Sequence, residues 1–157
     1  MDAMHELVSE AISDFRKVVA LACADAPTIE IKIEIANKPH HAPTLPADHM
    51  GVYAFFQEGQ ALKVGMAGAK SGPRFKFQHY KPTSAKSNLA KSILMNSARV
   101  GAVGVSPESV GNWIKMNTDR VNLLLPATVG RPILSLLESF LHVRWKPLFE
   151  GPAEDEE

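Results

Sequence analysis

The spacing of apolar residues changes between helical and strand periodicity along the first half of the chain. Residues 5–22 place apolar side chains three and four positions apart, which predicts an amphipathic helix. Residues 28–35 alternate isoleucine with charged residues, as in a half-buried strand. Two short apolar runs, 51–56 and 61–66, flank a turn segment that contains glycine, and they predict a β-hairpin.

The second half of the chain predicts helices around one more strand. Pro73 favours the start of a short helix over 74–80, and a second helical stretch covers 88–98. Ser106, Pro107 and Glu108 are typical of a helix start, and that helix should run to about residue 116. Apolar residues 121–125 predict a buried strand, and a last helix is expected from Arg131 to the proline at 147.

The composition is that of an ordinary globular protein. The chain has 157 residues, of which 45% are hydrophobic and 22% charged, and it holds one cysteine. A disulfide framework is therefore excluded, no apolar run approaches membrane-spanning length, and the acidic N-terminus does not resemble a signal peptide. We expect a soluble cytoplasmic protein with no membrane association. The proline-containing loop 37–48 predicts a boundary between an extension (1–48) and a core (49–150), followed by an acidic, disordered tail (151–157).

The net charge of zero hides a strong sorting of charge along the chain. Residues 59–107 contain no Asp or Glu but hold 6 lysines and 2 arginines, whereas both flanking segments are net acidic. A stretch of one sign favours binding of a polyanion, because each cation near a phosphate releases counterions. A solvated basic face without a ligand is the alternative.

Some polar residues stand in positions where their chemistry needs an explanation. Glu138 is the one acid in the apolar segment 132–145, and a buried carboxylate requires a cation, hydrogen bonds or a proton. Alternatively, its carboxylate could be exposed to solvent at the helix edge or pair with Arg144. His40, His41 and His49 lie in or beside the proline-containing loop, but without acidic or thiol neighbours they do not favour a metal site.

Tyr53 and Lys63 fall on the two strands of the predicted hairpin, and the loop after it leads to Arg74. Together with Glu138 and the basic segment, these side chains favour phosphodiester chemistry. That chemistry needs a metal near the phosphate, a base near the attacking water and positive charge over the phosphate oxygens.

The order of these motifs resembles the GIY-YIG nuclease superfamily over about residues 50–150. The resemblance is carried by Gly51-Val52-Tyr53, Lys63-Val64-Gly65, Arg74, His79 and Glu138. It implies a small α/β (α+β) domain with a three-stranded, mainly antiparallel sheet flanked by helices. It also implies DNA cleavage with one divalent cation, Mg²⁺ or Mn²⁺.

Residue roles follow from the same resemblance. Tyr53 corresponds to the tyrosine that acts as a base or orients water, Arg74 to the phosphate-stabilising arginine, and Glu138 to the metal ligand. Lys63 replaces the second tyrosine of the family, as in some restriction-enzyme-like members. His79, with Tyr80 as its rival, stands near the family's His or Tyr position. The asparagine that many members carry after the last helix is missing.

The expected function is therefore that of a metal-dependent DNA endonuclease. The backbone of DNA would be held by the lysines of the basic segment, Lys70, Lys76, Lys81, Lys86 and Lys91. A binding module that kept the scaffold and lost cleavage is the first alternative, and an interaction protein with an acidic partner is the second. The N-terminal extension could cover a sheet edge or form a homodimer.

Overall fold

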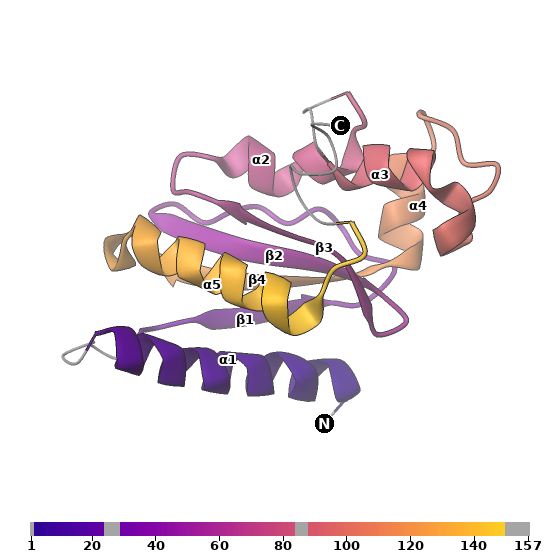
Figure 1. Cartoon of the computed structure of the whole chain (residues 1–157). Helices are drawn as coiled ribbons and strands as arrows, with labels where there is room; N and C mark the ends of the chain where they lie inside the picture. The colour runs from indigo at the N-terminus through magenta and orange to yellow at the C-terminus, as the bar shows by residue number, and fades with distance from the viewer. Residues whose placement is uncertain (1, 24–28, 84–87, 150–157) are drawn as a thin grey trace.

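The computed structural model describes residues 2–23, 29–83 and 88–149, and within these ranges the chain is a mixed α+β fold (Figure 1). Its helices and strands follow in chain order: α1 (Ala3–Ala22), β1 (Lys32–Ala36), β2 (His49–Gln57), β3 (Gln60–Ala67), α2 (Gly72–Lys76), α3 (Leu89–Met95), α4 (Val110–Asn117), β4 (Asp119–Pro126) and α5 (Arg131–Trp145). Three single-turn 3₁₀ helices join them: η1 (Gln78–Tyr80), η2 (Ser97–Val100) and η3 (Ala127–Val129). None of the helices in the described ranges has the length and apolar character needed to cross a membrane.

The sheet is antiparallel and has the strand order β1-β4-β2-β3. The predicted hairpin is present, with Tyr53 opposite Gly65 and Phe55 opposite Lys63. The expected count of three strands is wrong, because the alternating isoleucine segment adds β1 to β4, pairing Lys32 with Leu124. This fourth strand covers an edge of β4 that would otherwise present unpaired backbone groups.

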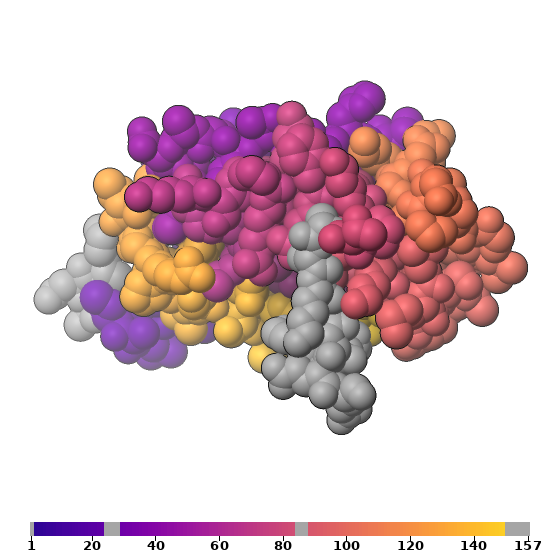
Figure 2. Space-filling model, turned by 90° about the horizontal axis from the view of Figure 1, so that it is seen from above, coloured from indigo at the N-terminus to yellow at the C-terminus, as the bar shows by residue number. Residues whose placement is uncertain are grey.

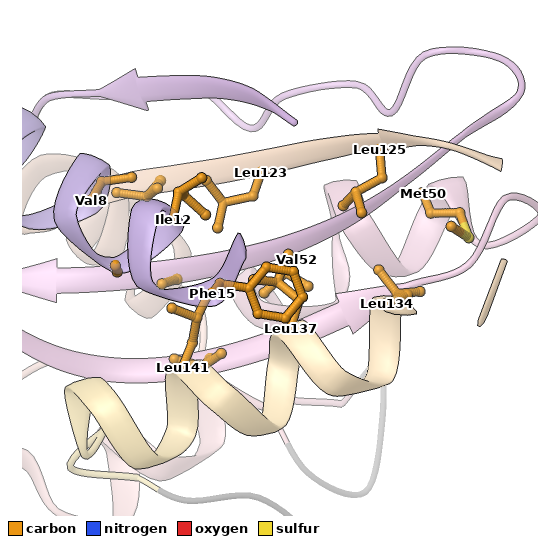
Figure 3. Close-up of a cluster of buried hydrophobic side chains, with 14 of the residues drawn as sticks. Val8, Ile12, Phe15, Met50, Val52, Leu123, Leu125, Leu134, Leu137 and Leu141 are labelled. Atoms are coloured by element: carbon orange, nitrogen blue, oxygen red, sulfur yellow. The ribbon is translucent and has the colours of Figure 1, made fainter. Parts of the chain in front are cut away.

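The two faces of the sheet carry different helices, because successive strand residues point to opposite sides. Figure 3 shows the first face, where leucines of α5 and apolar residues of α1 pack on the strands. Phe15 of α1 contacts Phe140 of α5 with ring centroids 5.6 Å apart. The N-terminal helix is thus part of the same core as the rest of the chain.

The second face is covered by α2, α3 and α4, which lie on the opposite side of the sheet from α1 and α5 (Figure 1). Tyr53 and Phe55 of β2 point to this face and pack with Phe75 of α2. The helix expected over 74–80 is divided: α2 ends at Lys76, and η1 continues as a tighter 3₁₀ turn. This break turns His79 and Tyr80 inward, and both are buried.

Candidate active site

The hairpin brings Tyr53 and Lys63 to the same face of the sheet. Both side chains are buried, at 1% and 4% exposure, so neither is an ordinary surface group. Tyr53 lies across Gly65 of the edge strand β3: a Cβ atom at residue 65 would stand 2.7 Å from the phenol oxygen. The missing side chain at Gly65 therefore lets the hydroxyl reach over β3.

Gly51 has a corresponding role for α2 and Arg74. A Cβ atom at residue 51 would lie 2.9 Å from the ring of Phe75, so the glycine makes room for this ring and lets α2 pack against β2. The Phe75 ring also meets Tyr53 edge-on, with centroids 5.7 Å apart. With Phe75 directed inward, Arg74 is exposed, and its guanidinium interacts electrostatically with the Tyr53 side chain.

His79 fixes the Tyr53 hydroxyl from the other side. The backbone N–H of Leu89, the first residue of α3, donates to Nδ1 of His79 at 3.0 Å. Nδ1 therefore carries no proton, and Nε2–H of the neutral ring donates to the Tyr53 oxygen at 2.7 Å. Burial, together with the charges of Lys63, Arg120 and Arg74, holds the pKa of His79 well below its usual range. His79 is accordingly a neutral hydrogen-bond donor that positions Tyr53.

The electrostatic environment of Tyr53 contains opposing effects. Burial raises the pKa of the phenol, the charges of Arg74 and Arg120 lower it, and the charge of Glu138 raises it. The net shift is upward. A hydrogen-bond donor to the phenol oxygen stabilises a phenolate, whereas the negative charge of the Glu138 carboxylate disfavours its formation.

Glu138 projects from α5 into this cationic environment and is partly buried. Burial raises the pKa of its carboxyl group, and the charges of His142, Arg74, Lys63 and Arg131 lower it, with an upward net shift. The alternative partner, Arg144, forms its ion pair with Asp14 of α1. The carboxylate of Glu138 is therefore electrostatically coupled to residues of the hairpin and α2, while Arg144 serves the contact between helices.

The five predicted site residues come from five separate elements. A hydrogen bond joins two of them and electrostatic interactions link the rest, so the fold brings into one region Tyr53 (β2), Lys63 (β3), Arg74 (α2), His79 (η1) and Glu138 (α5). Tyr80, the rival of His79, instead bonds to His40 and Arg120.

The predicted DNA-binding lysines differ in their exposure to solvent. Lys70 and Lys81 are exposed, Lys76 and Lys91 are partly buried, and Lys86 lies outside the described residues. Lys76 and Lys81 both place their ammonium groups over the ring of Phe77. In Figure 2, which views the molecule from above, the magenta segment containing α2 lies at the surface and borders the orange of α5.

Arg120 of β4 is a part of the site that the sequence interpretation missed. Its side chain is fully buried, and it donates to Asn122 at 2.8 Å, to the Tyr80 hydroxyl at 3.1 Å and to the backbone oxygen of Phe75 at 2.6 Å. Its guanidinium lies 4.7 to 5.8 Å from the centroids of four aromatic rings, those of Tyr53, Phe55, Phe75 and Tyr80. The only sequence signal for this cation near Tyr53 is that the polar residues Arg120 and Asn122 alternate with apolar residues in the strand segment.

A second buried histidine continues this network. The Thr118 carbonyl accepts from Nδ1–H of His40 at 2.8 Å, so Nε2 is unprotonated and accepts the hydroxyl hydrogen of Tyr80 at 2.8 Å. The Tyr80 oxygen then accepts from Arg120. Burial, the first cause, lowers the pKa of His40, which agrees with a neutral ring.

The donor set fits a cation only if substrate oxygens complete it. Among the described residues, no group of three His, Cys, Asp or Glu side chains is arranged to hold a metal ion. Glu138 supplies one carboxylate among several cations, so a bare divalent ion would meet repulsion. Mg²⁺ is nevertheless often held by one or two carboxylates together with substrate phosphates and water. Glu138 is the residue that would hold it, jointly with a phosphate that also neutralises the cations.

Comparisons of the chain with protein-family models, with curated proteins and with solved structures give no match. The fold class that the molecule itself defines is a mixed α+β domain with a four-stranded antiparallel sheet.

The buried, neutral state of His79 predicts that the protein loses stability in acid. Below pH 6.5, the usual pKa, the unfolded chain binds a proton at this ring and the folded chain does not. Unfolding then takes up a proton, so the free energy of unfolding should fall by up to about 1.4 kcal/mol per pH unit for this group. Urea unfolding between pH 7.5 and 5.5 measures the slope. His79→Gln should make it shallower, and an unchanged slope would contradict the neutral assignment.

Proposed function

We propose that this protein is a metal-dependent DNA endonuclease that hydrolyses phosphodiester bonds, with a GIY-YIG-like core. The observation that supports it best is the meeting of a phenol, an ammonium group, a guanidinium and a carboxylate from distant parts of the chain. Burial of the Lys63 ammonium group and partial burial of the Glu138 carboxylate cost free energy, because burial disfavours charge. A purely structural role explains such a set less well than phosphate chemistry does.

In this proposal each side chain has a distinct task. Nε2–H of His79 donates to the Tyr53 oxygen and the charge of Arg74 lowers the pKa of the phenol, so both favour a phenolate, which would accept a proton from the attacking water. Arg74 stabilises charge on the phosphate oxygens, and Lys63 supplies a second positive charge beside Glu138. A divalent cation held by Glu138 would polarise the phosphate and offset the carboxylate charge that raises the pKa of Tyr53.

Plasmid nicking tests the proposal. Purified protein should convert supercoiled plasmid to nicked or linear DNA in Mg²⁺ or Mn²⁺ and not in EDTA. The rate should rise with pH, because both Tyr53 and Glu138 have raised pKa values and act in their deprotonated forms.

Tyr53→Phe, purified identically, removes one oxygen and should slow cleavage roughly 10²-fold, a typical contribution of proton transfer. Equal nicking by both proteins would point to a contaminant. No nicking by the wild type on duplex, nicked, branched or single-stranded DNA would reject the endonuclease.

A nucleic-acid-binding module without cleavage is the second candidate. It is favoured by the upward shift of the Tyr53 pKa, which disfavours the phenolate, and by the cations around Glu138, which repel a divalent metal ion. Salt-dependent DNA binding without metal-dependent cutting would select this candidate.

A further inference from the structure

Phe77 is an exposed aromatic side chain in the segment that carries the site residues Arg74 and His79. It follows Lys76 at the end of α2, the helix that presents Arg74, and 43% of its surface is exposed. Its neighbour Phe75 is buried, at 1% exposure, so the helix end directs one ring inward and the other outward.

Two ammonium groups lie over the exposed ring, and a base that stacks on it would displace them. Nζ of Lys76 lies 5.2 Å and Nζ of Lys81 lies 5.1 Å from the ring centroid of Phe77. The surrounding segment, residues 59–107, contains no carboxylate. The flat apolar ring therefore belongs to a basic segment of the chain, and Figure 2 shows that this magenta segment lies on the outside.

A planar ring between cations matches one ligand chemistry in particular. An unpaired DNA base offers a π-face that stacks on an aromatic side chain, and the phosphates on either side of it pair with lysines. A base inside a regular duplex has both faces covered, so it cannot stack in this way. An acidic protein surface would match the lysines but would leave the ring without a planar partner.

We propose that Phe77 is a stacking platform for an unpaired or unstacked base of the DNA substrate, with the Lys76 and Lys81 ammonium groups moving from the ring to the adjacent phosphates. This inference rests on the proposed nuclease function and specifies its substrate as DNA that contains unpaired bases, such as a bulge, flap or junction. The basic segment attracts any DNA strand, and Phe77 selects those with a base available next to Arg74.

The experiment measures DNA binding in EDTA, so that cleavage does not interfere. Fluorescence anisotropy compares the full-length protein on oligonucleotides of one sequence, as a perfect duplex and as a duplex with a short bulge carrying 2-aminopurine. Phe77→Ala should weaken binding to the bulge about tenfold and change duplex binding less than about twofold, as expected for the loss of one stacked base. Phe77→Trp should retain bulge binding and 2-aminopurine quenching, whereas Phe77→Leu, apolar but not aromatic, should not.

Met95→Ala is the matched control, because Met95 is another exposed apolar side chain of the basic segment, at 72% exposure. It should leave binding to both DNAs unchanged. Two results would overturn the platform: equal losses of affinity for bulged and duplex DNA in Phe77→Ala, or wild-type affinity of Phe77→Leu for the bulge. Metal-dependent cleavage with Phe77-independent binding would reject the platform and leave the nuclease standing. Phe77-dependent binding without cleavage of any substrate would reject the nuclease and support the stacking site.

Discussion

Glu138→Gln should abolish most metal-dependent cleavage, with a loss of about 10³-fold or more. The substitution preserves the shape of the side chain and removes its charge, so a divalent cation loses its carboxylate ligand. Such a cation contributes several kcal/mol to a transition state in which charge develops on phosphate oxygens, and each 1.4 kcal/mol is worth about tenfold in rate. Initial nicking rates at saturating Mg²⁺ or Mn²⁺ measure the effect.

The fold and DNA binding should survive this change. The partly buried carboxylate already has a raised pKa because of its burial, so neutralising it does not remove a favourable ionised state. Loss of a negative charge near Arg74 and Lys63 should leave DNA affinity equal or higher. Asp14→Asn is the control, because it makes the same charge change in the ion pair with Arg144 and should alter the rate less than about twofold. A Glu138→Gln protein that keeps a tenth of the wild-type rate would contradict the assignment.

The sequence predicted local elements well because their periodicity is local. The alternating isoleucines predicted a strand, and the hairpin could be expected from two apolar runs around a turn. The partner of β1 could not be predicted, because pairing with β4 depends on a register between residues distant in the chain. The expectation of three strands failed at this point.

The same distinction separates the site residues that were predicted from those that were missed. Glu138 was recognisable as a lone acid in an apolar helix, and Tyr53 and Lys63 by their ordered hairpin motifs. Arg120 gave no comparable signal, because its burial depends on rings contributed by β2, α2 and η1. A strand arginine normally extends to solvent, and only the assembled second face of the sheet encloses this one.

The buried position of Arg120 predicts that its charge and its hydrogen bonds have separable roles. Its charge lowers the pKa of Tyr53, and its N–H groups hold the Phe75 oxygen beside Arg74. Replacing a buried charged group by an apolar one can be nearly neutral for stability. Replacing a buried arginine by lysine keeps the desolvation cost of the charge and loses some of the hydrogen bonds that the guanidinium donates.

Arg120→Lys should therefore be the less stable of two variants, with a loss of about 3–5 kcal/mol in the free energy of unfolding, against about 2 kcal/mol for Arg120→Met. Their cleavage pH profiles should show the opposite order. Arg120→Met removes the cation, so the pKa of Tyr53 rises and the profile moves to higher pH, while Arg120→Lys keeps the charge and the wild-type profile. Urea unfolding and nicking rates between pH 6 and 10 measure both effects. A Met variant with an unshifted profile would show that Arg120 supports the fold alone, and a Lys variant as stable as the wild type would refute the role of the guanidinium fork.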